Sequence, residues 1–382
     1  MNEVTGIYIH LPFCRSKCNY CDFNSYPDKD NLIPAYFKAV EMELDSYGNK
    51  LKHHRINTIF IGGGTPSYVN EKYIIQLLNT CRRNFNISSN AEITIESNPG
   101  TLCRDKVKAY RQSGINRLSI GLQAWQDRIL KKLGRTHTLE DYLNNFSLAR
   151  EEGFDNISTD LIFAIPGQTL EEWCETLENV VAMGPEHISC YSLQIEEGTV
   201  FGRLFSEGGL TPVDDEYDRE MYYRAKEILR NAGYEHYEIS NFAKPGYQCK
   251  HNLIYWQTAQ YLGVGAGAHS YIEGKRFNNV YSPEKYINLI QTGKSTVENV
   301  INIDREEAMS EYMILGLRLI EGISGRDFEN KFGVGLWEAF GVPLEKLLRK
   351  GLIVIDPEKG NNVRLTEKGL DLANQVFVEC IR

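Results

Sequence analysis

The chain has 382 residues, of which 42% are hydrophobic and 24% charged, as expected of a globular protein with one large and one smaller domain. Its 42 basic and 51 acidic side chains leave a net charge of −9, which argues against general binding of nucleic acid. No signal peptide or apolar run of membrane-spanning length is recognisable, so we expect a cytoplasmic protein whose nine cysteines stay reduced and free to bind metal.

Short β-rich segments alternate with helical patterns over residues 1–233. The predicted strands are Gly6–His10, Thr58–Ile61, Glu92–Glu96, Arg117–Gly121, Ser158–Phe163 and His187–Leu193. The predicted helices are Ile33–Tyr47, Glu71–Phe85, Leu102–Ser113, Leu139–Glu152, Leu170–Met183 and Asp215–Asn231. This alternation predicts an α/β fold with a parallel sheet, partly closed as a TIM-like (β/α)6 barrel whose chemistry lies at the C-terminal ends of the strands.

The rest of the chain is less regular. We expect residues 234–303 to form an accessory segment that links two domains. Residues 304–382 are predicted to form a small winged-helix-like α+β domain, with elements at Asp304–Glu321, Leu344–Lys350, Leu352–Asp356, Asn362–Thr366 and Glu367–Cys380. Winged helices often bind DNA, but residues 344–382 carry seven Lys/Arg and six Asp/Glu, so a structural or docking role is favoured.

Three cysteines with the spacing C-x3-C-x2-C follow the first predicted strand, namely Cys14, Cys18 and Cys21. Three thiolates can hold three irons of a [4Fe–4S] cluster and leave the fourth iron free to bind a small molecule. The alternative is a structural zinc site, which usually takes four ligands in two pairs, and a second C-x-x-C motif is missing from the sequence. The spacing therefore favours the cluster.

Glycine and polar residues follow the other predicted strands and should lie at the same end of the sheet. The run Gly62–Pro66 would let backbone N–H groups approach a nucleoside-containing ligand. Glu96, Gln123 and Asp160 come at the ends of later strands or within them, and they suit hydroxyl or ammonium groups of a ligand. Arg135 could pair with a carboxylate, although a surface ion pair is the favoured interpretation of this residue alone.

His251 begins a segment that contains two further aromatic residues. A histidine near Tyr255 and Trp256 could be an axial ligand of haem iron, with the aromatic rings covering the macrocycle. Composition alone favours the other interpretation, a hydrogen-bonded histidine in an aromatic core. Covalent attachment of haem is not indicated, because the sequence has no C-x-x-C-H motif.

The cysteine motif after the first strand and the GGGTP run after the second resemble the radical SAM superfamily. In that superfamily a [4Fe–4S] cluster reduces S-adenosylmethionine and releases a 5′-deoxyadenosyl radical. The strings Tyr8–Cys14, Gly121–Gln123, Leu133–His137 and Asp160–Gly167 are similar to those of the oxygen-independent coproporphyrinogen III oxidase group. The resemblance covers nearly the whole chain, and it implies a radical SAM barrel with a C-terminal domain.

Two features decide between the members of this group. True coproporphyrinogen dehydrogenases have a further cysteine where this chain has Phe23, which argues against that activity. The segment His251–Trp256 matches the H-N-x-x-Y-W motif of the haem chaperone family HemW, a motif linked to haem binding. The resemblance thus implies a haem chaperone that transfers haem to acceptor haemoproteins, with His251 as the haem ligand.

The alternative is an oxidase that converts coproporphyrinogen III to protoporphyrinogen IX in porphyrin biosynthesis. The sequence leaves open whether S-adenosylmethionine is cleaved, so no catalytic residue is assigned. Expected partners are haem and acceptor haemoproteins, respiratory ones included. The resemblance is also compatible with a homodimer and with peripheral contact at a membrane.

The resemblance implies roles for individual residues. Cys14, Cys18 and Cys21 would bind the cluster. The residues that would contact S-adenosylmethionine are Tyr8, Tyr20, Gly63, Gly64, Thr65, Glu96, Gln123, Arg135 and Asp160. Tyr20 stands where the family usually has phenylalanine, a change that a contact through the backbone would tolerate.

Overall fold

The computed structural model describes residues 4–356 and 361–382. The expectation that the chain has no signal peptide includes residues 1–3, which lie outside the described residues. Six strands correspond to the predicted ones: β1 (Val4–Leu11), β2 (Arg55–Gly63), β3 (Asn86–Ser97), β4 (Arg117–Gln123), β5 (Ile157–Phe163) and β6 (His187–Ser192). Each pairs with the next in parallel. Strand β1 is not paired with β6, so the barrel is open, and the predicted α/β partial barrel is confirmed.

Further strands extend both edges of this parallel sheet. They are β7 (Glu235–Glu238), β8 (Asn241–Ala243), β9 (Gln260–Val264), β10 (His269–Ile272), β11 (Lys275–Asn279) and β12 (Val297–Asn302). Within the described residues, the sheet has twelve strands in the order β12-β11-β10-β9-β1-β2-β3-β4-β5-β6-β8-β7. Residues 234–303, expected to link two domains, therefore supply strands to both sheet edges.

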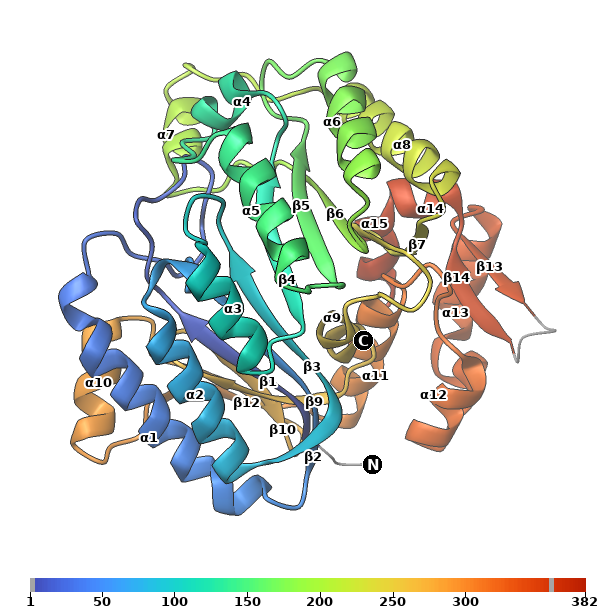
Figure 1. Ribbon diagram of the computed structural model, residues 1–382. Coiled ribbons are helices and arrows are strands. Elements are labelled where there is room, and N and C mark those ends of the chain that lie inside the picture. Colours follow the sequence, from blue (N-terminus) through green and yellow to red (C-terminus); the bar gives the residue numbers. More distant parts are fainter. Residues whose placement is uncertain (1–3, 357–360) are drawn as a thin grey trace.

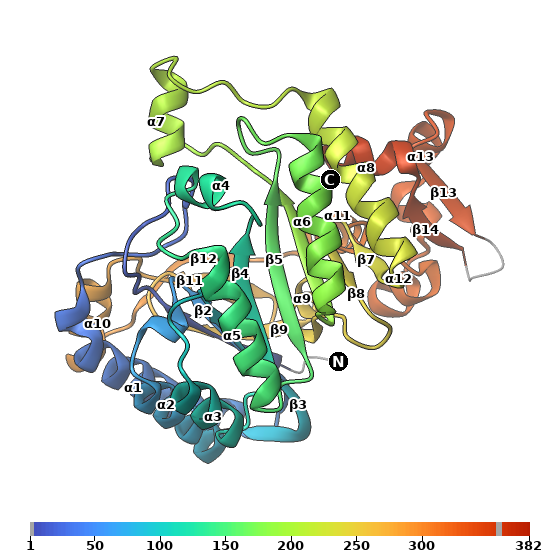
Figure 2. The ribbon, with the colours of Figure 1, turned by 45° about the horizontal axis from the view of Figure 1, so that its top comes forward.

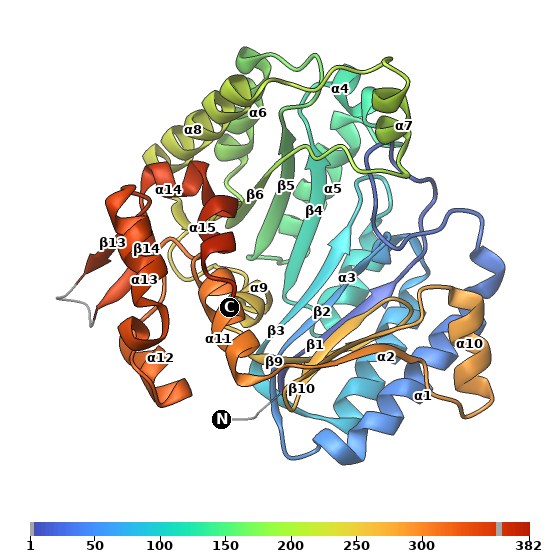
Figure 3. The ribbon, with the colours of Figure 1, turned by 180° about the vertical axis from the view of Figure 1, so that it is seen from behind.

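Helices cover the outer face of the sheet (Figures 1 and 2). The long ones are α1 (Ile33–Leu51), α2 (Glu71–Asn84), α3 (Arg104–Gln112), α5 (Leu139–Glu151), α6 (Leu170–Met183) and α8 (Asp215–Asn231). The shorter ones are α4 (Asp127–Lys132), α7 (Val200–Ser206), α9 (Lys250–Trp256) and α10 (Pro283–Gln291), with 3-10 turns at Asp30–Leu32 and Pro66–Tyr68. Helix α9 is the exception, because it packs against β1, β2 and β9 on the inner side of the sheet, next to Tyr8 and Phe60 (Figure 3).

Burial follows the sequence pattern of each element. In α2 the buried residues Ile74, Leu77, Leu78 and Cys81 recur with the spacing of one helical face. Every residue of β4 is buried, as expected of a central parallel strand. The main core therefore lies between the sheet and its outer helices, and it leaves the ends of the strands for the site.

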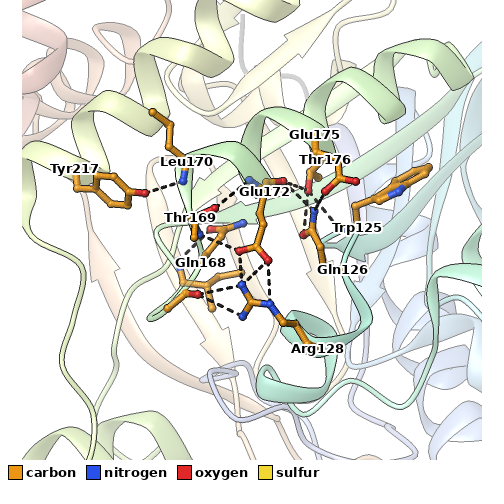
Figure 4. A network of polar contacts seen from close by, with 12 residues as sticks. Trp125, Gln126, Arg128, Gln168, Thr169, Leu170, Glu172, Glu175, Thr176 and Tyr217 are labelled. Carbon is orange, nitrogen blue, oxygen red and sulfur yellow. Dashed lines mark hydrogen bonds and ion pairs between the residues drawn. The ribbon is translucent and has the colours of Figure 1, made fainter.

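Polar contacts fix the start of α6 against its neighbours (Figure 4). Thr169 and Glu172 form a capping box that begins the helix. Glu172 also accepts a hydrogen bond of 2.9 Å from Nε of Arg128 in α4. From α8, the hydroxyl of Tyr217 accepts a hydrogen bond of 2.6 Å from the N–H of Leu170. These contacts hold α4, α6 and α8 together next to the strand end of β4.

The C-terminal part has a hydrophobic core of its own, built around residues such as Met313, Phe328 and Val363. Its elements are α11 (Arg305–Gly316), α12 (Gly325–Phe332), α13 (Leu336–Arg349), β13 (Ile353–Asp356), β14 (Asn362–Leu365), α14 (Glu367–Asp371) and α15 (Ala373–Glu379). Figure 3 shows it beside the sheet, with α11 next to α9. The domain boundary near residue 304 stays an interpretation.

Three predicted helix boundaries in this part are wrong. Helix α11 ends at Gly316 and not at Glu321. The chain comes close to Ile323 at this glycine, because a Cβ at Gly316 would lie 2.2 Å from Cγ2 of Ile323. Helix α13 begins before the predicted Leu344, because a kink at Phe340 accommodates Pro343. The last helix is divided at Leu372, whose backbone angles are not helical. Among the described helices, none is both long and apolar enough to cross a membrane.

Candidate functional site

The loop after β1 brings three cysteines to one cavity of about 500 Å³. They are Cys14, Cys18 and Cys21. Lys17 closes the loop, because its Nζ donates hydrogen bonds to the carbonyls of Phe23 (3.0 Å) and Ser25 (3.2 Å). The N–H of Cys14 donates to the carbonyl of Tyr26 over 3.2 Å. The loop is therefore ordered by its own contacts.

Two polar groups lie beside the sulfur atoms of the cysteines. Burial raises the pKa of the Cys14 thiol, and the hydroxyl of Thr65, 3.5 Å from its sulfur, acts in the opposite direction. Nη1 of Arg135 donates to the sulfur of Cys18 over 3.5 Å. Metal binding requires thiolates, so a hydroxyl and a guanidinium at this position suit a metal-ligating loop.

The glycine run after β2 approaches the cysteine loop closely. A Cβ at Gly64 would lie 2.6 Å from the carbonyl oxygen of Phe13 and 3.0 Å from the sulfur of Cys14. Gly63 has φ of +116°, a conformation that favours glycine. The turn can therefore present its backbone to the cavity only because these side chains are absent.

Two carboxylates, on the strands β3 and β5 that flank β4, line the same cavity. Glu96 accepts a hydrogen bond of 3.0 Å from the N–H of Gly63, and burial, followed by the charge of Asp160, raises its pKa to about 8. Asp160 accepts hydrogen bonds from the hydroxyls of Ser119 (2.9 Å) and Ser189 (2.8 Å). A cationic group of a ligand between the two carboxylates would offset their repulsion.

Arg135 is part of a buried network and does not form the surface ion pair that its sequence alone favoured. Its Nη2 donates to Oδ1 of Asn98 (2.8 Å) and to the carbonyl of Gly121 (2.9 Å). Asn98 in turn donates to the hydroxyl of Thr65 over 3.0 Å. No motif singled out Asn98, although it directly follows β3 in the segment that begins with Glu96.

The residues predicted to contact S-adenosylmethionine line the cavity of the cysteines, with the exception of Tyr8. Tyr20, Gly63, Gly64, Thr65, Glu96, Gln123, Arg135 and Asp160 all line the cavity of the cysteines. Tyr8 lines an adjacent cavity of about 720 Å³, and its hydroxyl lies 3.0 Å from Nδ1 of His10. Four residues line both cavities: Asp22, Phe23, Gly63 and Glu96. The two cavities therefore share a wall.

His251 is buried behind the second cavity and is 1% exposed. Its Nδ1 lies 2.7 Å from the hydroxyl of Thr58, and its Nε2 lies 2.9 Å from the hydroxyl of Tyr255. Burial, with a smaller effect of Arg117, lowers its pKa to about 3. Both ring nitrogens are engaged, while Tyr255 and Trp256 line the cavity. The role of His251 as a haem ligand stays a prediction.

The residues present fit the cofactors that the motifs imply. Three thiols face one cavity, and the buried Nε of Arg135 and Oγ of Ser97 have no hydrogen-bond partner among the described residues. Thiols suit an iron–sulfur cluster, while spare donors and two carboxylates suit a zwitterionic ligand beside it.

Comparisons with known proteins found two matching families and relatives of similar length. Residues 8–180 match the radical SAM superfamily, and residues 303–372 match the HemN C-terminal domain. The heme chaperone HemW of Bacillus subtilis is 40% identical over 371 residues, which cover 97% of each chain. That of Lactococcus lactis is 35% identical over 99% of this chain and 97% of its own.

A solved structure has the same fold over the whole chain. Coproporphyrinogen III oxidase (HemN) from Escherichia coli matches with a TM-score of 0.86 and 22% identity, covering 100% of this chain and 91% of that one. At this identity the match concerns the fold.

Proposed function

The chain belongs to the HemW family, and on this premise we propose that it is a haem chaperone, which binds haem and transfers it to acceptor haemoproteins. The observation that carries the proposal is the 40% identity to the heme chaperone HemW of Bacillus subtilis over 97% of both chains. We include respiratory haemoproteins among the acceptors and place the protein in the cytoplasm, where its nine cysteines would stay reduced.

The second cavity supports haem binding. Its volume of about 720 Å³ lies in the range of ~300–1,000 Å³ that is usual for cofactor sites. The aromatic side chains on its wall suit a flat macrocycle: Tyr255, Trp256, Tyr261, Tyr271 and Tyr281. The first two belong to the H-N-x-x-Y-W motif, so the motif contributes to this wall.

We propose that the first cavity holds a [4Fe–4S] cluster on Cys14, Cys18 and Cys21, with S-adenosylmethionine beside it. Such a cluster supplies one-electron chemistry when it is bound. The carboxylates of Glu96 and Asp160 would take the cationic part of S-adenosylmethionine. The N–H groups of Gly63 and Gly64 already donate to Glu96 and to the carbonyl of Leu11, so the glycine turn would contribute by leaving space for the ligand beside the cysteine loop.

Phe23 favours haem transfer over porphyrinogen oxidation. It stands where the oxidases have a further cysteine, it is 64% exposed, and it lines both cavities. The likeness to coproporphyrinogen III oxidase concerns the fold, at 22% identity. Incubation of the loaded protein with coproporphyrinogen III, S-adenosylmethionine and a reductant should therefore yield no protoporphyrinogen, and steady turnover would contradict the assignment.

Haem transfer itself is the direct test. The full-length, cluster-loaded protein is charged with haem and mixed with haem-depleted respiratory membranes, and recovery of the cytochrome spectra is followed. Serum albumin charged with the same amount of haem is the control for passive release. Transfer faster than from albumin is expected. Failure to bind haem, or transfer no faster than from albumin, would refute the proposal.

A further inference from the structure

We propose that haem binds in the second cavity with His269 as its iron ligand and with Arg276 as the partner of one propionate group. This inference rests on the proposed haem-binding function and deepens it by naming the site. His269 begins β10 and is paired with Asn278, while Arg276 of β11 is paired with Tyr271, so one hairpin supplies both side chains to the wall of the cavity.

The other histidines near this cavity have both ring nitrogens engaged. His10 lies 3.0 Å from the hydroxyl of Tyr8 and 2.8 Å from the carbonyl of Asn24. His251 is held by Thr58 and Tyr255 and does not line the cavity. Coordination of iron by either residue would require a hydrogen bond to be broken and the ring to move.

His269 is free of such constraints. It is exposed at the cavity wall, and its Nε2 makes a single long contact of 3.5 Å with the hydroxyl of Tyr281. Desolvation at the cavity wall, together with the charge of Arg276, lowers the pKa of His269 below its ordinary value, which favours the neutral ring. A neutral imidazole with an available nitrogen is the form that binds haem iron.

Arg276 offers a carboxylate site at the same wall. Its Nη1 and Nη2 bind Glu311 of α11 over 2.7 and 3.1 Å. Its Nε is buried and has no hydrogen-bond partner among the described residues, and each Nη keeps a second N–H, so donors remain for a propionate. The guanidinium also lies 5.4 Å from the ring centroid of Tyr271, so it is held in place beside an aromatic surface.

The H-N-x-x-Y-W segment then acts as a support for this site. Trp256 packs against Arg318, whose Cζ lies 4.5 Å from the centroid of the indole ring. His251 holds the hydroxyl of Tyr255, so His251 is a positioning residue in this arrangement. Phe23 and Glu96 belong to both cavities, and haem bound here would lie next to the cluster and S-adenosylmethionine.

The test is a titration of the full-length, cluster-loaded protein with hemin, followed by absorption spectroscopy of the haem. The variants are His269→Ala and His251→Ala, with the exposed His53→Ala as a control. Loss of even an outer-shell partner of a metal ligand costs about 10–100-fold in affinity, so H269A should bind hemin at least about tenfold more weakly. It should also lose the histidine-ligated spectrum, which H251A and H53A should keep.

Rescue separates ligation from misfolding. His269→Gly should regain the histidine-ligated spectrum when imidazole is added, and its iron–sulfur content should equal that of the unchanged protein. The assignment of His269 as the iron ligand would be overturned if H269A kept the histidine-ligated spectrum while H251A or Tyr281→Phe lost it. The chaperone proposal would still stand. If the unchanged protein binds no hemin, the chaperone proposal itself fails.

Discussion

Nη1 of Arg135 donates a hydrogen bond to the sulfur of Cys18 over 3.5 Å, although 117 positions separate the two residues in the chain. The same guanidinium holds Asn98 after β3 and the carbonyl of Gly121 in β4. One side chain thus joins the cysteine loop to two strand ends. The planar guanidinium of Arg135 has five N–H donors and is suited to three acceptors at once.

Replacement of Arg135 by lysine should weaken the binding of S-adenosylmethionine. Lysine keeps the charge, but its single nitrogen cannot reach all three acceptors. Hydrogen bonds to charged groups contribute about 1.5–3 kcal/mol, so we expect affinity to fall by at least about tenfold in isothermal titration calorimetry. The control is Arg128→Lys, which alters a contact with Glu172 away from the cavity. Equal affinity in R135K would contradict this role.

Cysteine 18 should be required for the cluster. Anaerobic reconstitution should load about four irons per chain, as a cubane cluster implies. With Cys18→Ala the iron content and the visible absorption of the cluster should fall to near background. The exposed Cys103→Ala is the matched control and should load fully. Full loading of C18A would exclude the proposed ligand set.

Glu96 should make the ligand-free protein less stable as pH rises. Its pKa is raised from 4.5 to about 8, first by burial and then by Asp160. The folded state therefore retains a proton that the unfolded chain has lost, and the free energy of unfolding decreases as pH rises from about 4.5 to about 8. Glu96→Gln should flatten this dependence in urea unfolding at pH 5.5 and 8. The exposed Glu178→Gln should leave it unchanged.

Glu92 should stabilise the start of α9. Its carboxylate accepts hydrogen bonds from the N–H groups of Lys250 (3.3 Å) and His251 (3.2 Å), and it lies near the buried Arg117. Glu92→Gln should lower the free energy of unfolding by about 1.5–3 kcal/mol, because one acceptor and the negative charge are lost. Chemical denaturation measures this, with the exposed Glu207→Gln as control. An unchanged midpoint would count against the role.

Much of the central fold could be predicted from sequence, because its strands are buried and bounded by turns. The edge strands could not. Residues Tyr234–Ile272 contain short strands, some of which pair with partners distant in sequence, such as β9 with β1. Strand β3 begins six residues before the predicted Glu92, because its polar first residues pair with β2 at Arg55. Such pairings depend on tertiary contacts that local patterns do not contain.

The site residues likewise include some that the sequence could indicate and some that it could not. The cysteines and the glycine turn carry recognisable spacings, and they lie together at the first cavity. Asn98 and His269 carry no motif, and their significance follows only from neighbours brought near by folding. The motif drew attention to His251, whose role stays a prediction. Its partner Thr58 is 193 positions away, so the sequence could not reveal that this ring nitrogen is engaged.

The position of β1 between β2 and β9 has a consequence for biosynthesis. Ile9 is paired with Ile61 on one side and with Val264 on the other. Strand β1 is therefore synthesised first, but its second neighbour in the sheet is synthesised much later. At translation rates of ~5–20 residues per second, roughly ten to fifty seconds pass before its second neighbour emerges from the ribosome. During that time one edge of β1, beside the nascent cysteine loop, is open to wrong pairing. We therefore expect iron–sulfur insertion to follow the emergence of Val264, and nascent chains that stall before this residue to aggregate.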